Sequence, residues 1–252
     1  MKIVAVIPIK LNNRRLPGKN IMPFTNGKPL CTYIQNTLKS IPKIDDIYIY
    51  CSDESIKRYL LPGIKYLRRS NTLDKDQTSI PEVLTSFSHD VPADVYVLCH
   101  ATAPFISAES IQSGLDAVLS GEYDSSFSAT IMQDFLWSEG RPFNYSLSKI
   151  PRTQDLSPFY VESSGFYIYT ANVINNLGRR IGDKPKIIEI QKYESIDIDE
   201  KEDFEMANAW YNYTLITAQG GGQSEIISHP GIYSNPCLDI CLSFNDIWGV
   251  LA

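Results

Sequence analysis

The hydrophobic pattern of the chain alternates between short, continuously apolar runs and longer segments with helical spacing. Residues 2–9 and 94–99 are almost wholly apolar, which is typical of strands buried on both faces of a parallel sheet. Apolar residues at positions 30, 31, 34 and 38 recur at helical spacing, and Pro42 ends that segment. Such repeated strand–helix units predict a three-layer α/β fold with a mostly parallel sheet.

The remaining elements are predicted from the same two patterns, short apolar runs for strands and helical spacing for helices. We expect further strands at residues 47–51, 64–67, 125–131, 165–169, 187–190 and 195–198. We expect helices at residues 78–87, from Ser107 or Ser110 to Leu119, at 173–177 and at 201–213, and a short helix capped by Ser52 and Asp53. The stretch 135–159 is rich in proline, serine and aromatic residues and predicts an excursion from the sheet.

Length and charge narrow the function classes. The chain has 252 residues, of which 43% are hydrophobic and 21% charged, as in ordinary globular proteins. We expect one domain over residues 1–217, followed by a glycine-rich linker and a tail of unassigned role over 218–252. The net charge of −6 argues against a general nucleic-acid surface. No apolar run reaches the roughly 18 residues of a membrane span.

Cysteine usage and the first residues favour a cytoplasmic protein. Cys31, Cys51 and Cys99 each lie singly in apolar stretches, as buried free thiols do. The first apolar run leads into a basic loop instead of a cleavage site, so it does not predict a signal peptide. Cys237 and Cys241 form an isolated pair, which is a weak signal for zinc.

The strongest chemical signal is the loop that follows the first strand. Lys10, Arg14, Arg15 and Lys19 lie close together in a chain that is acidic overall. Ligands of open α/β sheets bind beyond the carboxyl ends of the strands. Lysine and arginine side chains, with backbone N–H groups, bind phosphates at such positions. The loop therefore indicates either a triphosphate site or a solvated basic loop.

Asp197 and Asp199 form the second signal. Residues i and i+2 of a strand point to the same face, so the predicted strand near 195–198 brings the two carboxylates together. Mg²⁺ is usually held by one or two carboxylates plus substrate phosphates and water. The alternative is that Asp199 caps the following helix, with Glu202 completing a capping box.

Two further polar segments carry weaker signals. His100 follows a buried strand, in a loop that also contains Thr102, and a lone histidine is more often a structural hydrogen-bonding residue than a catalyst. The mixed polar and aromatic stretch 152–160, which includes Arg152 and Gln154, fits either a sugar pocket or a subunit contact.

Taken in order, these segments resemble the CMP-sialic acid synthetases, the acylneuraminate cytidylyltransferases. The loop from Pro8 to Asn20 keeps the spacing of the family signature P-A-R-x-G-S-K-x-x-P-x-K-N. The resemblance covers residues 1–213, with further matches at 51–54 (S-T-D-D/E), 102–105 (T-S-P-F/L), 152–165 (R-x-Q-x-L-P…N-G) and 197–203 (D-I-D…D).

The resemblance implies a Rossmann-like nucleotidyltransferase, and a homodimer in which a small dimerisation excursion reaches toward the partner's site. The resemblance also implies the reaction: a hydroxyl of sialic acid or a related nonulosonic acid attacks the α-phosphate of CTP, giving a CMP-sugar for surface glycans and releasing pyrophosphate. The implied roles are catalysis by Lys19, Arg14 and Asp199, Mg²⁺ binding by Asp197 and Asp199, acceptor binding by His100, Thr102, Arg152 and Gln154, and nucleotide binding by Pro8, Lys10, Leu11, Asn12, Asn13, Arg14, Arg15, Lys19 and Asn20.

Departures from the family pattern bear on the acceptor. His100 stands where the family has glutamine, Ile106 where it has arginine, and Ser164 where it has asparagine. These positions face the sugar in the family, so a different nonulosonic acid or a smaller anionic or phosphonate acceptor stays open. Lys10 in place of arginine supplies a point charge without a bidentate fork.

Two other functions stay open at this point. A nucleotide-sugar glycosyltransferase also uses a D-x-D metal site, although that motif normally follows a mid-chain strand. A nucleotide-binding module would bind CTP without turnover, if the replacements at Lys10 and His100 remove the chemistry.

Overall fold

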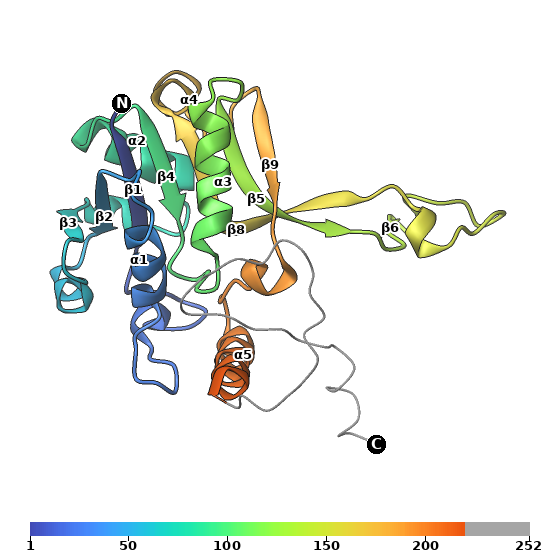
Figure 1. Cartoon of the computed structure of the whole chain (residues 1–252), viewed down its shortest axis with the longest axis horizontal. Helices are drawn as coiled ribbons and strands as arrows, with labels where there is room; N and C mark the ends of the chain where they lie inside the picture. Colours follow the sequence, from blue (N-terminus) through green and yellow to red (C-terminus); the bar gives the residue numbers. More distant parts are fainter. Residues whose placement is uncertain (220–252) are drawn as a thin grey trace.

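A seven-stranded sheet forms the centre of the computed structural model, which describes residues 1–219 (Figure 1). Its strands lie in the order β3-β2-β1-β4-β8-β5-β9, and β8 alone runs antiparallel to its neighbours. The strands are β1 Ile3–Ile9, β2 Asp46–Cys51, β3 Lys65–Arg68, β4 Val95–Cys99, β5 Ser125–Met132, β8 Phe159–Thr170 and β9 Pro185–Glu189. The predicted α/β fold with a mostly parallel sheet is confirmed.

The predicted cap at Ser107 is confirmed, and a second serine cap, at Ser79, was not predicted. Ser79 forms a capping box with Glu82 at the start of α2, and the Ser107 side chain caps α3. The α-helices are α1 Cys31–Lys39, α2 Ile80–Asp90, α3 Ala108–Leu119, α4 Ala171–Leu177 and α5 Lys201–Gln219. Short 3₁₀-helices are η1 Lys19–Ile21, η2 Glu54–Tyr59, η3 Asn71–Asp74, η4 Thr153–Asp155 and η5 Lys192–Ser195.

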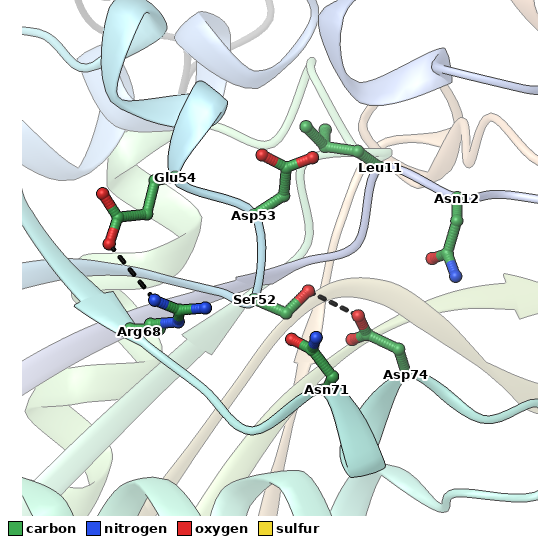
Figure 2. Close-up of a pocket in the computed structure, with 8 residues that line it drawn as sticks. All are labelled: Leu11, Asn12, Ser52, Asp53, Glu54, Arg68, Asn71 and Asp74. Atoms are coloured by element: carbon green, nitrogen blue, oxygen red, sulfur yellow. Dashed lines mark hydrogen bonds and ion pairs between the residues drawn. The ribbon is translucent and has the colours of Figure 1, made fainter.

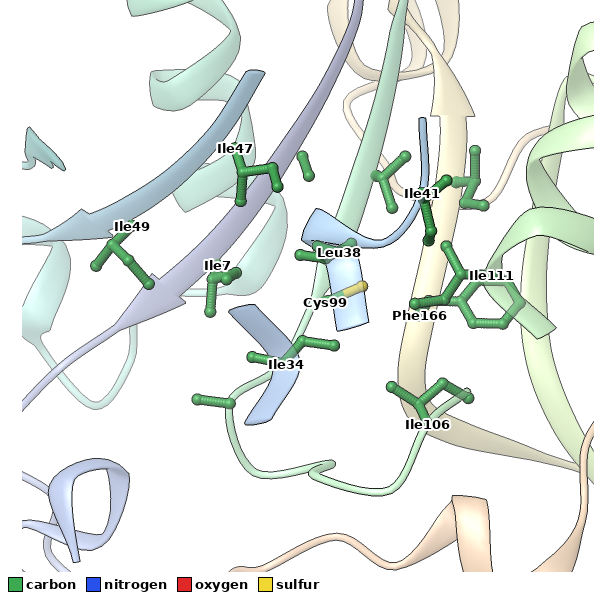
Figure 3. Close-up of a cluster of buried hydrophobic side chains, with 14 of the residues drawn as sticks. Ile7, Ile34, Leu38, Ile41, Ile47, Ile49, Cys99, Ile106, Ile111 and Phe166 are labelled. Atoms are coloured by element: carbon green, nitrogen blue, oxygen red, sulfur yellow. The ribbon is translucent and has the colours of Figure 1, made fainter. Parts of the chain in front are cut away.

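Alternate residues of the central strands pack into two separate hydrophobic layers, one on each face of the sheet. On one face, Ile7 packs with residues of α1 and α3, such as Ile34 and Ile111 (Figure 3). On the other face, Val4 and Val6 pack with residues of α2 and α4. Each such side chain contributes about 1.5–3 kcal/mol when it is fully buried. The continuous apolar runs of the sequence therefore mark strands that are covered on both faces.

A long hairpin projects from the sheet and contains the predicted excursion (Figure 1). β8 begins at Phe159 instead of residue 165, and its outer half pairs with the outer half of β5. Beyond that pairing, β6 Trp137–Ser138 and β7 Arg141–Pro142 form a small two-stranded sheet. We call residues 133–158 the arm. The sequence underestimates β8 because its outer half is exposed and has no core periodicity.

The predicted strand at 195–198 is wrong. Residues 192–195 form η5, and residues 196–199 are irregular. This segment has no neighbouring strand to pair with: Ile198 N donates to Thr102 O at 2.9 Å, and the Ile198 side chain is buried in a third cluster with Phe105 and Phe204. A buried isoleucine between two aspartates gives the same apolar–polar alternation as a strand, although the segment is irregular.

Three smaller expectations concern thiols, membranes and the tail. Cys31, Cys51 and Cys99 are buried free thiols, as predicted. Within residues 1–219, no helix has the length and apolar character that crossing a membrane requires. α5 extends beyond the predicted end at 213, and the rest of the predicted tail, including Cys237 and Cys241, lies outside the described residues.

Candidate active site

The candidate site lies at the carboxyl edge of the sheet, where the loops after β1, β2, β3 and β4 meet. These four strands are parallel, so their carboxyl ends share one edge. The loop after β1 turns at Gly18, which has the left-handed φ of 70° that favours glycine, and then forms η1. This turn places Lys19 directly against the segment that precedes α5.

Lys19 is the buried cation of this site. Its residue is only 8% exposed, and its Nζ donates to Ile198 O at 2.7 Å and to Asp199 Oδ1 at 2.9 Å. These bonds join residues 179 and 180 positions apart in the chain. The D-I-D segment is therefore held at the carboxyl edge by a lysine of the first loop, and no strand is needed to position it.

Asp199 receives a second cation, because Arg15 Nη2 lies 2.7 Å from the same Oδ1. Burial raises the pKa of Asp199, but the hydrogen bond and charge of Lys19, together with Arg15, outweigh burial and lower the pKa below its ordinary value. The carboxylate is thus ionised at neutral pH. Asp203 lies in the first turn of α5, and its Oδ2 accepts from Asp199 N at 3.0 Å and Glu200 N at 2.8 Å.

Asp197 has an oxygen without a hydrogen-bond partner. Its Oδ1 is buried and accepts no bond from the residues that the structure describes. A buried acceptor left unpaired costs about 1–3 kcal/mol, more when charged, so it calls for a ligand. The described part of the chain holds no group of three or more Asp, Glu, His or Cys residues able to bind a metal. A cation at Asp197 and Asp199 would therefore need further oxygens from a substrate or from water.

The other two cations of the loop pair with one carboxylate. Arg14 Nη1 lies 2.7 Å from Asp76 Oδ2, and Lys10 Nζ lies 3.5 Å from Asp76 Oδ1. Asn20 is buried, and its Nδ2 donates to Lys10 O at 3.0 Å, which holds the loop in shape. The interpretation as a solvated basic loop fits Arg14, which is largely exposed. It does not fit Lys19, which is buried.

A polar pocket of about 470 Å³ opens beside this loop (Figure 2). Figure 2 shows Ser52 directed toward Asp74, and Glu54 paired with Arg68. Eight residues line it: Leu11, Asn12, Ser52, Asp53, Glu54, Arg68, Asn71 and Asp74. Leu11 and Asn12 were predicted to bind nucleotide, whereas the walls from β2 and β3 were missed. The rule that ligands bind at the carboxyl edge was the signal that pointed to those walls.

A buried ion pair fixes one wall of this pocket. Arg69 donates from Nε at 3.0 Å and from Nη2 at 2.5 Å to Asp74 Oδ1, and its side chain is only 4% exposed. The neighbouring Arg68 is exposed and lies 3.5 Å from Glu54. The two adjacent arginines therefore differ in their surroundings: Arg69 has a buried partner, and Arg68 has a solvated one.

Replacing Arg69 by methionine is expected to lower the free energy of unfolding by about 3–5 kcal/mol, because Asp74 is left without its partner in a poorly solvated position. Arg68→Met is the control, with an expected loss of no more than about 1 kcal/mol. Urea unfolding followed by circular dichroism measures both. Equal losses in the two variants would show that the Arg69–Asp74 pair contributes no more to the free energy of unfolding than an exposed ion pair.

His100 and Thr102 follow β4 and approach the D-I-D segment. Burial lowers the pKa of His100 to about 4, against the opposing charge of Asp197, so the imidazole is neutral at physiological pH. Thr102 contributes its backbone oxygen to Ile198 N. Ile106 is buried among core side chains (Figure 3), so it offers no polar contact to a ligand.

Arg152 and Gln154 lie on the arm, apart from these loops. Both are exposed, and Arg152 forms a bidentate pair with Asp155 at 2.8 and 2.9 Å. Arg152 contacts only nearby Asp155 among residues 1–219, and the role of Arg152 and Gln154 in acceptor binding stays a prediction. Pro8 and Asn13 lie in the β1 end and loop as expected, with Asn13 Oδ1 buried and unpaired among the described residues.

The structure adds one cluster that the sequence reasoning missed. Arg180, which follows α4, stacks its guanidinium 3.9 Å from the centroid of the Tyr167 ring and lies 2.7 Å from Glu162 Oε1. Tyr167 donates its hydroxyl to the same Glu162 oxygen at 2.5 Å and meets the His100 ring edge-on. No local pattern around Arg180 distinguishes it from a surface arginine, because its partners lie on β8.

Known proteins show similarity over most of the chain. It is 24% identical over 215 residues to an N-acylneuraminate cytidylyltransferase of Streptococcus agalactiae, covering 81% of this chain and 52% of that protein. The chain thus spans about half the length of that relative. It is 27% identical over 227 residues to a pseudaminic acid cytidylyltransferase of Campylobacter jejuni, covering 84% of this chain and 97% of that enzyme.

A solved structure and a family profile complete the comparison. The fold resembles that of CMP:2-keto-3-deoxy-manno-octonic acid synthetase complexed with CTP, with a TM-score of 0.65 and 15% identity over 84% of this chain and 99% of that one. The profile described as Cytidylyltransferase matches residues 4–220, which is most of the chain. By this match, together with the loop geometry at the carboxyl edge, the chain belongs to the cytidylyltransferase family.

Proposed function

We propose that this protein transfers CMP from CTP to an acidic sugar, a sialic acid or related nonulosonic acid, and releases pyrophosphate. The observation that carries the proposal is buried Lys19, which joins the cationic loop to Asp199 at the carboxyl edge. The relatives are named for N-acylneuraminate and pseudaminic acid, which supports an acidic sugar as the acceptor.

In this proposal the cationic loop binds the triphosphate of CTP. Asp76 holds Lys10 and Arg14 in place, and a polyphosphate offers these cations more charge on closely spaced oxygens than one carboxylate does. Lys19 is already desolvated and oriented, so it stabilises charge on the phosphates without a reorganisation cost. The pocket lined by Leu11, Asn12 and Ser52 is the place for the nucleoside.

The residues present fit a Mg²⁺ ion. Asp197 offers a buried oxygen without another partner in the described chain, and Asp199 is held ionised. Mg²⁺ accepts one or two carboxylates together with phosphate and water oxygens. When bound, it supplies charge neutralisation for phosphoryl transfer. Lys19 and Arg15 hold the carboxylate of Asp199 in position for that role.

The direct test is pyrophosphate release in the presence of Mg²⁺, with each of the four nucleoside triphosphates and a panel of acceptors. The panel contains N-acetylneuraminate, other nonulosonic acids, 3-deoxy-manno-octulosonate and small phosphonates. We expect release with CTP and one acidic sugar. Release with a phosphonate instead supports the smaller-acceptor alternative. A protein whose melting temperature rises with CTP but that turns over no acceptor is a nucleotide-binding module, and no response to any nucleotide overturns the proposed site.

We also propose that the arm joins two copies of the chain in a homodimer. Its exposed apolar side chains include Trp137, Phe143, Leu147 and Ile150, and the last three are each more than 60% exposed. A projecting segment with this much apolar surface is typical of an interaction site. Figure 1 shows the arm directed away from the sheet, where a second subunit has access to it.

Changing Leu147 and Ile150 together to glutamate is expected to convert the dimer into a monomer, because the charges cannot be buried in an apolar interface. Size-exclusion chromatography with light scattering measures the mass against the 28.4 kDa of one chain. Met206→Glu, on an exposed position of α5, is the matched control and leaves the mass unchanged. A monomeric wild-type protein, or a double variant that stays dimeric, contradicts the proposal.

A further inference from the structure

Arg180 is a partly buried cation that the phosphate chemistry does not use. Its side chain is 28% exposed, and its guanidinium carbon lies over the Tyr167 ring, 3.9 Å from the ring centroid. Stacking on an aromatic face and pairing with Glu162 restrict the rotation of the side chain. The guanidinium is therefore held in one orientation before any ligand arrives.

Most of the hydrogen-bonding capacity of Arg180 is unused within the described residues. Nη2 donates to Glu162 Oε1 at 2.7 Å, and that is the only hydrogen bond of this guanidinium in that part of the chain. Glu162 is also engaged by the Tyr167 hydroxyl. An arginine has five N–H donors in a planar fork, which matches the two oxygens of a carboxylate.

The charges of Arg180 and of the active-site residues act on the same groups. Burial lowers the pKa of His100, and Arg180 and Lys19 lower it further, whereas Asp197 and Asp199 raise it. Arg180 and Asp197 likewise act in opposite senses on the pKa of Tyr167. Arg180 lies over the Tyr167 ring, and the Tyr167 ring meets the His100 ring edge-on with centroids 6.4 Å apart.

The other cations of the site are assigned to the triphosphate, whereas Arg180 is not. Lys10 and Arg14 face Asp76, and Arg15 and Lys19 face Asp199, in the loop that we assign to the triphosphate. An acidic acceptor brings another negative charge next to that triphosphate and to two aspartates. A cation on the acceptor side offsets this repulsion.

We propose that Arg180 binds the carboxylate of the acceptor and selects acidic sugars over neutral ones. The inference rests on the proposed transferase function. The carboxylate occupies the N–H groups that Glu162 leaves unused, while Tyr167 and Glu162 keep the guanidinium in position. Arg180 is a specificity-determining residue in this scheme and takes no part in bond making.

The test compares Arg180→Met with Arg179→Met. Arg179 is the adjacent arginine, is more exposed and pairs with Asp183, so its variant controls for loss of a local charge. We expect Arg180→Met to raise the KM for the acidic acceptor roughly 10- to 100-fold, the usual range for a hydrogen bond to a charged group. The KM for CTP and the melting temperature stay near their wild-type values. Arg179→Met leaves all three unchanged.

A second readout separates recognition from a structural role. The wild-type enzyme is expected to prefer the acidic acceptor to its neutral amide at least tenfold in kcat/KM, and Arg180→Met to lose that preference. Arg180→Lys keeps a point charge without the fork, so it is expected to retain part of the preference. It replaces the methionine variant in this test if that variant is unstable. A preference that survives in both variants overturns the inference. Absence of any CTP-dependent turnover in the wild-type enzyme instead refutes the underlying function.

Discussion

Replacing Lys19 by alanine is expected to lower kcat/KM for CTP by about 10²–10³-fold, the usual loss when one preorganised charge partner is removed from an active site. Lys19 is buried, points at Asp199 and lies in the loop assigned to the phosphates. Its charge is therefore little screened by water. Steady-state pyrophosphate release at fixed acceptor concentration measures the effect.

Lys28→Ala is the matched control for this variant. Lys28 lies in the next turn of the same connection between β1 and α1, and it is exposed. Its removal is expected to leave kcat/KM within twofold of wild type. Circular dichroism and melting temperature establish that the Lys19 variant is folded. Near-wild-type activity in a folded Lys19→Ala protein would remove Lys19 from the phosphate site.

Asp199→Ala is expected to cost a similar factor, about 10²–10³ in kcat. The substitution removes the ionised carboxylate proposed to hold Mg²⁺, and it leaves Lys19 and Arg15 without their shared partner. Chelation of divalent ions is expected to abolish wild-type activity, and added Mg²⁺ to restore it. The variant is expected to need more Mg²⁺ and to recover less.

Glu200→Ala separates this effect from a loss of acidic charge near α5. Glu200 is exposed and adjacent, and its contact with Asp203 uses the backbone N, which alanine keeps. A Mg²⁺ titration of both variants decides the role of Asp199. If Asp199→Ala has the wild-type Mg²⁺ dependence and kcat, the carboxylate does not take part in metal binding.

The pattern of apolar residues was sufficient for strands that are buried on both faces. β1 and β4 are covered on both faces, so their continuous apolar runs identify them without knowledge of the partners. Ser107 marks a helix start because a cap is a local hydrogen bond. The outer half of β8 gives no such signal, since its pairing partner in β5 is distant and its side chains are exposed.

The D-I-D segment lies at the carboxyl edge of the sheet for a different structural reason than the predicted one. A strand was expected to align Asp197 and Asp199, but the segment is irregular. Lys19 binds the Ile198 carbonyl, and burial of Ile198 beside Phe204 anchors the same segment. Residue types indicated the chemistry, whereas contacts across the fold set the geometry.

The sequence by itself determined the α/β class, the order of most elements, the cationic loop at the end of β1 and the pair of aspartates near the start of α5. These features depend on local periodicity, on capping and on residue chemistry. Only the tertiary structure decided that Lys19 meets Asp199, that Asp76 holds Lys10 and Arg14, and that Arg180 stacks on Tyr167. Those contacts join residues of different elements, and the local sequence does not show which side chain of another element will come within bonding distance.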